Sequence, residues 1–293
     1  MLPAIDLGFA DIYLYGPIFM LGTVIAVFII RKLAVPCGVD IHDSLYAVIY
    51  GLIGLLIGAK ALYFITKLPN IISHFGKYLE YLEADPMAAL NYAFGGLVFY
   101  GGLIGFALGV LRYCRHFKIP LFGIVDLYTP FLPFVHGFGR IGCFMAGCCY
   151  GIEYHGVLAV HFPFNEIEPE LSAVPRFPVQ LLEAALNFTC FAVLMILMRR
   201  DMKRKESERR FKQGQLLGIY LTYYLVARFL LELLRGDDTD RGMIGFLSTS
   251  QIISLLLIVP AVLLLRAKGR EKIFFVPQKE EVVGQESIRV EKK

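Results

Sequence analysis

Long apolar stretches recur along the whole chain, and they constrain its fold more strongly than any other feature. A helix needs about 20 apolar residues to cross a bilayer, because its backbone polar groups find no water there. Hydrophobic residues make up 57% of the 293 residues and charged residues only 18%, which is far from the composition of a soluble domain. We therefore expect an all-α integral membrane protein with about seven transmembrane helices. The expected spans are Leu14–Ile30, Asp43–Ile65, Phe94–Tyr113, Leu121–Phe138, Pro178–Met198, Leu216–Leu234 and Gly245–Leu265.

The basic residues orient these spans. Arg31 and Lys32 follow the first span, and dense runs of lysine and arginine lie at 199–212 and 266–293. Because positively charged loops stay in the cytoplasm, the N-terminus is expected outside and the C-terminus in the cytoplasm. An odd number of spans agrees with this orientation. Basic runs next to spans indicate contact with anionic lipid, so no nucleic-acid partner is expected.

A single transmembrane domain is expected at residues 1–275, with two segments outside its spans. Residues 68–93 mix charged residues, tyrosines and a proline, which predicts an amphipathic arm lying in the membrane interface. Residues 151–177 contain prolines, acidic residues and a short apolar run, and they predict a small extracytoplasmic cap. The polar, charged tail at 276–293 is expected to be disordered.

Polar side chains within the apolar spans mark a candidate site, because unpaired charges at membrane depth are costly. Arg228, Glu232 and Arg235 lie at i, i+4 and i+7, so they are expected to share one helical face. By the orientation above, nearly all of these polar groups lie toward the outer half of the bilayer, and such convergence is typical of a site. The set comprises Tyr15, Asp126, Arg140, Gln180, Glu183, Arg228 and Glu232, together with Tyr100 between two glycine pairs.

Most of this set also has a purely structural explanation. Tyr15 is equally explained as an interfacial anchor, Asp126 as a cap or structural partner, and Arg228 with Glu232 as an intrahelical ion pair. The glycine-rich run at 95–105 either forms part of a binding site or packs helices in the manner of GxxxG motifs. Arg140 has the weakest structural explanation, since it ends an apolar run within a glycine-rich stretch, residues 133–151. Glycine lets a ligand approach the backbone closely, so an anion such as a lipid phosphate is expected there.

Three of the six cysteines cluster at Cys143, Cys148 and Cys149, on the side where disulfides can persist. A structural disulfide from Cys143 to Cys148 or Cys149 is the leading explanation. A nucleophilic thiolate beside Arg140 is the alternative. A zinc site is disfavoured because no CxxC pair is present. The other three cysteines are isolated and are expected to be inert: Cys37, Cys114 and Cys190.

In this arrangement the chain resembles the prolipoprotein diacylglyceryl transferase family over almost its full length. The resemblance implies a seven-helix, multi-pass enzyme of the bacterial inner (cytoplasmic) membrane with its N-terminus outside. It implies transfer of the diacylglyceryl group of phosphatidylglycerol to the lipobox cysteine thiol of a prolipoprotein signal peptide, with release of glycerol phosphate and without a cofactor or metal. A related transferase with another acceptor and a non-enzymatic lipid-binding protein are the alternatives. The motifs in register are Tyr15-Gly16, Gly95–Gly105, Asp126–Gly151, Phe177–Glu183, Arg228–Arg235 and Leu247–Gln251.

The resemblance also implies roles for individual residues. Arg140 and Arg228 match the family's essential arginines and would grip the lipid phosphate, while Glu232 would orient Arg228 and Tyr15 would hold the headgroup. The expected catalytic residues are Arg140, Arg228, Glu232, Tyr100, His136 and Cys148. The expected substrate-binding residues are Tyr15, Gly101, Gly102, Arg140, Cys143, Gly151 and Arg235.

The chain departs from the family pattern at three positions. Tyr100 stands where the family commonly has histidine in FHGGLIG, and Cys143 and Cys148 replace the Asn and the Glu of GRxGNFxNGE. A tyrosine is a poor base at neutral pH. We therefore hypothesise that His136, four residues before Arg140, is the base, or that Cys148 supplies a thiol where the family uses a carboxylate.

Overall fold

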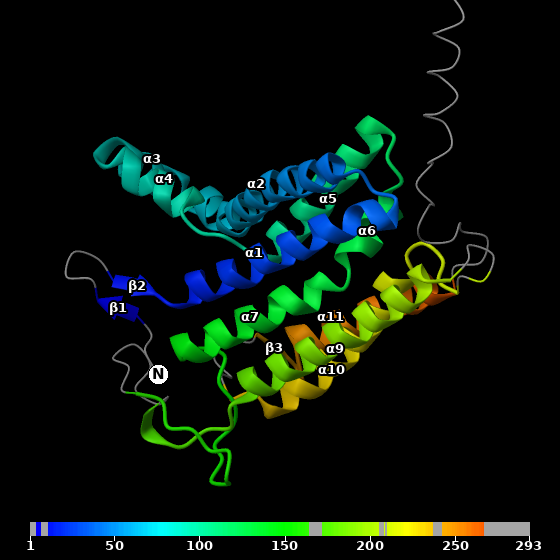
Figure 1. The fold of residues 1–293 in the computed structure, drawn as a ribbon. Coiled ribbons are helices and arrows are strands. Elements are labelled where there is room, and N and C mark those ends of the chain that lie inside the picture. The colour runs from blue at the N-terminus through cyan, green and yellow to red at the C-terminus, as the bar shows by residue number, and fades with distance from the viewer. Residues whose placement is uncertain are drawn as a thin grey trace, which may run out of the picture. The chain divides into compact units, whose positions relative to one another are not determined.

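A computed structural model describes residues 4–6, 11–163, 172–204, 208, 210–236 and 242–266 of the chain, most of them helical (Figure 1). The chain divides into two compact units, Met1–Gly38 with Val125–Lys293, and Val39–Ile124. The expectation of one domain over residues 1–275 stays a prediction. The tail at 276–293, expected to be disordered, lies outside the described residues.

The first unit is a row of helices in which α1 packs beside a helix far from it in the sequence. Helix α1 packs against α7, α7 against α9, α9 against α10, and α10 against α11 (Figure 1). Two short antiparallel hairpins, β1–β2 and β3–β4, belong to the same unit. The elements are β1 (Ala4–Asp6), β2 (Asp11–Tyr13), α1 (Tyr15–Ala34), η1 (Val35–Cys37), α7 (Phe131–Ala146), α9 (Val179–Met202), α10 (Gln215–Leu231), η3 (Glu232–Leu234), β3 (Met243–Ile244), β4 (Leu247–Ser248) and α11 (Thr249–Leu265).

The second unit is built on a long helical pair, α2 (Ile41–Ser73) and α5 (Phe99–Phe117), which pack along each other. Helices α3 (Phe75–Ala84) and α4 (Pro86–Phe94) cover most of the expected interfacial arm. Helix α2 begins at an Asp40 cap and runs unbroken to Ser73, although the sequence predicts that the span ends at Ile65. Pro69 does not stop it.

Glycines let α2 and α5 approach to backbone contact. A Cβ atom on Gly105 would collide with the carbonyl oxygen of Gly54, and one on Gly54 would collide with that of Gly105. Gly58 and Gly101 face each other in the same way. The packing explanation of the glycine-rich run therefore holds for Gly101 and Gly105.

Four helical segments in the described part of the chain are long and apolar enough to cross a membrane. The bent pair of α6 (Leu121–Tyr128) and α7 makes a fifth if it is one span, and α11 is a shorter apolar helix. Helix α5, where the third span is expected, is not in this set. These findings support an all-α membrane protein, while the count of about seven spans and the orientation of the termini stay predictions. The four segments are Tyr15–Cys37, Ile41–Ser73, Val179–Met202 and Gln215–Leu234.

The expected fourth span is broken and longer than predicted. Helices α6 and α7 meet at an angle of 41°, and Pro130 stands at the N-cap of α7. The helix then continues through the glycine-rich motif to Ala146, well beyond Phe138. His136 and Arg140 therefore lie one turn apart on one helical face. The hypothesis that His136 acts beside Arg140 requires this arrangement.

Asp126 fixes the start of α10. Its side chain is fully buried, and its Oδ2 accepts a hydrogen bond of 2.6 Å from the backbone N–H of Gly214. Gly214 is the N-cap of α10 and has a φ of +83°, a conformation that favours glycine. The structural explanation of Asp126 as a capping partner therefore matches the contact observed.

We expect the substitution Asp126→Leu to lower the free energy of unfolding by about 1–3 kcal/mol, because it leaves the buried N–H of Gly214 without an acceptor. Asp126→Asn keeps an oxygen acceptor of the same shape and is the matched control. The measurement is the midpoint of thermal unfolding of both variants in detergent. Equal midpoints for the Leu and Asn variants would contradict the capping role.

Candidate active site

Arg140 lies on α7 and faces α9. Its Nε atom lies 3.1 Å from Oε1 of Glu183 and donates a hydrogen bond of 3.2 Å to Nε2 of His136. Only 14% of the Arg140 side chain and 4% of the Glu183 side chain are exposed. Within the part of the chain that the structure describes, the two Nη groups of Arg140 have no hydrogen-bond partner. A guanidinium anchored through Nε and open at both Nη groups is suited to bidentate binding of an anion.

Arg228 lies near the end of α10 and is held from two sides. Its Nη1 lies 2.7 Å from Oε2 of Glu232, and its Nη2 donates a hydrogen bond of 3.0 Å to Oγ of Ser250 on α11. A capping box between Ser248 and Gln251 fixes the first turn of α11, on which Ser250 stands. The ion pair expected at i, i+4 is therefore confirmed. Ser250 is a partner that the sequence did not indicate.

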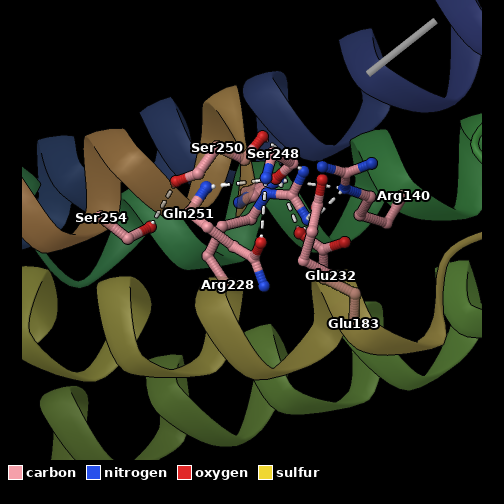
Figure 2. A network of polar contacts seen from close by, with 9 residues as sticks. Arg140, Glu183, Arg228, Glu232, Ser248, Ser250, Gln251 and Ser254 are labelled. Atoms are coloured by element: carbon pink, nitrogen blue, oxygen red, sulfur yellow. Dashed lines mark hydrogen bonds and ion pairs between the residues drawn. The ribbon is translucent and has the colours of Figure 1, made fainter. Parts of the chain in front are cut away.

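Both arginine–glutamate pairs lie in one polar network, in which Figure 2 labels Arg140, Glu183, Arg228 and Glu232. The charges of Arg140 and Arg228 both act on the His136 ring, which packs edge-on against Tyr224 with centroids 5.4 Å apart. Because Nε2 of His136 accepts the hydrogen bond from Arg140, its lone pair is occupied and does not take up a proton from a thiol in this geometry. The base role expected of His136 stays a prediction, and the contact favours a positioning role.

Tyr15 stands at the start of α1, beside the last turns of α7. A Cβ atom on Gly142 would lie 2.9 Å from Cδ2 of Tyr15, so the missing side chain is what lets the tyrosine pack there. Tyr15 interacts electrostatically with Arg140 and with Cys143, and it is 43% exposed. The structure thus brings Tyr15 near Arg140, and the headgroup role expected of Tyr15 stays a prediction.

Arg235 departs from the helical face expected for it. Helix α10 ends at Leu231, a 3-10 turn follows at Glu232–Leu234, and Arg235 is extended with a φ of −86° and a ψ of 142°. The expectation that Arg235 shares a face with Arg228 and Glu232 is therefore wrong. The cause is an antiparallel backbone bridge between Arg235 and Gly151, which pulls the chain out of the helix. Gly151 itself is pressed against the carbonyl oxygen of Phe177, so no larger residue fits there.

The three clustered cysteines meet at the end of α7, with Cys143 in its last turn and Cys148 and Cys149 just after it. Their Sγ atoms all lie within 4.8 Å of one another, and all three are free thiols, so the expected disulfide is not formed in this structure. The pKa of the Cys149 thiol is lowered by side-chain hydrogen bonding with Cys143 and Cys148 and by the positive charges of Arg140 and Arg235. Side-chain hydrogen bonding with Cys143, then with Cys149, raises the pKa of Cys148. Among the described residues, this is the group whose geometry suits a metal ion.

Tyr100, Gly101 and Gly102 lie on α5 in the other unit, and the structure does not relate them to Arg140. Tyr100 is 40% exposed. Gly101 faces the carbonyl oxygen of Gly58, and a Cβ on Gly102 would lie 3.3 Å from the Leu55 side chain. The substrate roles expected of these three residues stay predictions.

Comparison with known proteins assigns the chain to a family. The model of the family described as prolipoprotein diacylglyceryl transferase matches residues 3–267. The chain belongs to this family. It is 32% identical over 264 residues to phosphatidylglycerol–prolipoprotein diacylglyceryl transferase 2 of Clostridium perfringens, with 89% of this chain and 94% of the relative covered. It is 33% identical over 248 residues to the Clostridium tetani enzyme, covering 85% and 90%, and 30% identical over 270 residues to that of Geobacter sulfurreducens, covering 89% and 94%.

This member of the prolipoprotein diacylglyceryl transferase family carries its two arginine–glutamate pairs within one compact unit. The sequence indicated Glu183 as a polar residue of a span but not as the partner of Arg140, because the pair joins α7 to α9. A carboxylate near the start of an apolar helix was the available signal, since it needs a cation nearby. The residues expected in the site that the structure places in this unit are Tyr15, His136, Arg140, Cys143, Cys148, Gly151, Arg228, Glu232 and Arg235.

Proposed function

We propose that the protein transfers the diacylglyceryl group of phosphatidylglycerol to the lipobox cysteine of prolipoproteins. A thioether forms, and glycerol phosphate is released. The relatives of similar length carry this activity in their names. The observation that carries the proposal is Arg140, whose side chain is only 14% exposed and is anchored by Glu183 through Nε, while both Nη groups have no partner among the described residues.

The chemistry requires the phosphate to become a better leaving group. The phosphodiester carries one negative charge, and the phosphate monoester that leaves carries up to two, so negative charge grows in the transition state. The open fork of Arg140 stabilises that growth, and Arg228, oriented by Glu232 and Ser250, adds a second cation. Donors already fixed by protein partners need little reorganisation during the reaction.

The protein works in the bacterial cytoplasmic membrane, which it crosses in about seven spans with its N-terminus outside. This orientation puts the start of α1 and the end of α7 at the outer face, where a secreted precursor presents its cysteine. Tyr15 holds the lipid headgroup there. The other residues proposed to contact substrate are Tyr100, Gly101, Gly102, Cys143, Cys148, Gly151 and Arg235.

Transfer by the purified protein tests the proposal. Protein in phosphatidylglycerol vesicles is incubated with a lipobox peptide, and mass spectrometry follows the peptide cysteine. We expect a mass increase equal to one diacylglyceryl group, and none with a peptide whose cysteine is replaced by alanine. Release of glycerol phosphate with no modified peptide would instead favour a transferase with another acceptor. Lipid binding without any release would favour a lipid-binding protein.

We expect His136→Gln to retain turnover within about tenfold of the wild type, because glutamine keeps an acceptor for Arg140 Nε. Loss of a general base lowers turnover by about 10²–10⁴-fold. His136→Ala, which removes the acceptor, is the companion variant and should lower turnover more than His136→Gln does. An equally large loss in both variants would show that His136 is the base.

A further inference from the structure

The acceptor thiol must lose its proton before it attacks, and none of the described His and Glu partners of Arg140 and Arg228 is left as a free base. The lone pair of His136 Nε2 is occupied by Arg140, and Glu183 and Glu232 are each paired with an arginine. The cysteine cluster stands directly beside this network, since the charge of Arg140 acts on Cys149. The cysteine cluster, defined as Cys143, Cys148 and Cys149, is therefore the nearby group of reactive side chains to which the contacts above assign no role.

A tight backbone turn after α7 brings the three sulfur atoms together. Helix α7 ends at Ala146, its C-cap Gly147 has a φ of +73°, and the Cys148 N–H donates to the carbonyl oxygen of Cys143 at 3.1 Å. Cys149 has a φ of +58°, which is uncommon for a residue with a side chain and costs about 1–2 kcal/mol. Gln180 on α9 fixes the turn by donating to the Cys148 carbonyl at 2.9 Å. Strain of this kind is retained where the position of a side chain matters.

The spacing of the sulfurs fits a tetrahedral metal ion. Zinc binds thiolates at about 2.3 Å, which places sulfur ligands about 3.8 Å apart, and the three Sγ atoms lie within 4.8 Å of one another. Cys148 and Cys149 are adjacent in sequence and form no CxxC pair with Cys143. The absence of a CxxC pair is why the sequence disfavoured zinc. Three protein ligands with one open position are the pattern of catalytic rather than structural zinc.

The charges around the cluster also suit such a site. Three thiolates and one Zn²⁺ carry a net charge of minus one, and Arg140 and Arg235 supply compensating positive charge at Cys149. Tyr15 from α1 also faces the cluster, since all three cysteines act on it. Cys148 is exposed while Cys143 and Cys149 are half-buried, so the cluster is open on one side.

We propose that Cys143, Cys148 and Cys149 bind a zinc ion whose open fourth position takes the acceptor thiol as a thiolate. This inference rests on the proposed transfer reaction and departs from the expectation of an enzyme without metal. A metal-bound thiol is deprotonated outright, so the site removes the proton of the acceptor thiol. A base for this step is otherwise left open, since Tyr100 replaces the family's histidine and Cys148 its glutamate.

The step balances without any further reagent. The acceptor thiol releases its proton to water on binding, and its sulfur lone pair attacks the glyceryl carbon that bears the phosphate. The C–S bond forms as the C–O bond breaks, and the electron pair of that bond leaves with the phosphate oxygen. Glycerol phosphate departs beside Arg140, and the neutral thioether, a weaker ligand than the thiolate, dissociates from the metal.

Metal content tests the site independently of activity. Protein purified under a phosphine reductant should hold about one zinc ion per chain. Changing an outer-shell partner of a zinc site already weakens metal binding about 10–100-fold, so Cys143→Ser, Cys148→Ser and Cys149→Ser should each lose at least that much. Cys190→Ser, which changes a buried thiol on α9, is the matched control and should keep its zinc. Zinc content no higher than in the triple serine variant, or a disulfide within the cluster in freshly isolated membranes, would overturn the proposal.

Cobalt substitution then tests the fourth position. The cobalt-loaded protein should show thiolate-to-metal charge transfer, and a lipobox peptide should increase it, whereas the alanine peptide should not. An unchanged spectrum would overturn thiol binding. Transfer at the full rate by metal-free protein would leave the proposed function intact and overturn this inference. A spectrum that changes with the lipobox peptide, without any transfer, would support the metal site and overturn the proposed function.

Discussion

Replacing Arg140 by lysine is expected to lower the turnover of transfer about 100-fold while leaving the fold intact. Lysine keeps the positive charge but loses the planar fork, so it cannot hold Glu183 and bind two phosphate oxygens at once. Removing a single donor to a developing oxyanion costs about 10²–10³-fold in other enzymes. The measurement is the rate of peptide modification at saturating lipid, together with the unfolding midpoint of the same sample.

Two further variants are the comparisons for Arg140→Lys. Arg140→Ala leaves Glu183 buried and unpaired, which destabilises a protein by about 3–5 kcal/mol, so its loss of activity mixes folding with catalysis. Arg199→Lys, an exposed position in the last turn of α9, is the matched control and should behave as the wild type. If Arg140→Lys transfers at the wild-type rate, the guanidinium fork does not grip the phosphate, and the role proposed for Arg140 is lost.

The parts of the site that could be predicted are those set by local sequence. The ion pair of Arg228 with Glu232 follows from i, i+4 spacing on one helix, and the structure has it at 2.7 Å. The pair of Arg140 with Glu183 joins two helices whose contact is a matter of tertiary packing. The sequence shows that each of these two residues needs a partner, but it does not show which partner.

The errors in the prediction have the same origin. Arg235 continues the helical spacing in the sequence, yet a long-range bridge to Gly151 ends the helix before it. Apolar length located α1, α9 and α10 to within a few residues, because crossing a bilayer depends on composition alone. The cysteine cluster depends on a turn. Gly147 and Cys149 adopt left-handed conformations that bring the three sulfur atoms together, and the spacing of the cysteines in the sequence did not indicate them as ligands of one metal ion.

The glycine stripe between α2 and α5 should be among the positions of the chain that are most sensitive to substitution. Gly105→Ala adds a methyl group that would collide with the carbonyl oxygen of Gly54 and lie 3.0 Å from the Cα of Gly58. Backbone atoms cannot rotate away as a side chain can, so the two helices must separate. We expect a loss of about 1–3 kcal/mol or more in the free energy of unfolding, measured by thermal unfolding in detergent.

Gly76→Ala is the matched control for this prediction, because a Cβ atom on Gly76 meets nothing within 4 Å. It lies in a helix of the same unit, where alanine is preferred to glycine by up to about 1 kcal/mol, so it should be neutral or stabilising. Equal unfolding midpoints for Gly105→Ala and Gly76→Ala would show that α2 and α5 do not meet at backbone distance.

The same glycine run also distinguishes packing from substrate binding. The atoms nearest to a methyl group on Gly102 belong to the Leu55 and Ala59 side chains and the Leu55 carbonyl, at 3.3–3.6 Å, so Gly102→Ala should fold nearly as well as the wild type. If Gly102→Ala keeps its unfolding midpoint but loses transfer, Gly102 contacts the substrate. If it keeps both, while Gly105→Ala loses its stability, the glycine-rich run serves the helix pair. The backbone contacts at Gly101 and Gly105 favour the second outcome, because glycines that already touch a neighbouring helix leave little room for a lipid on that face.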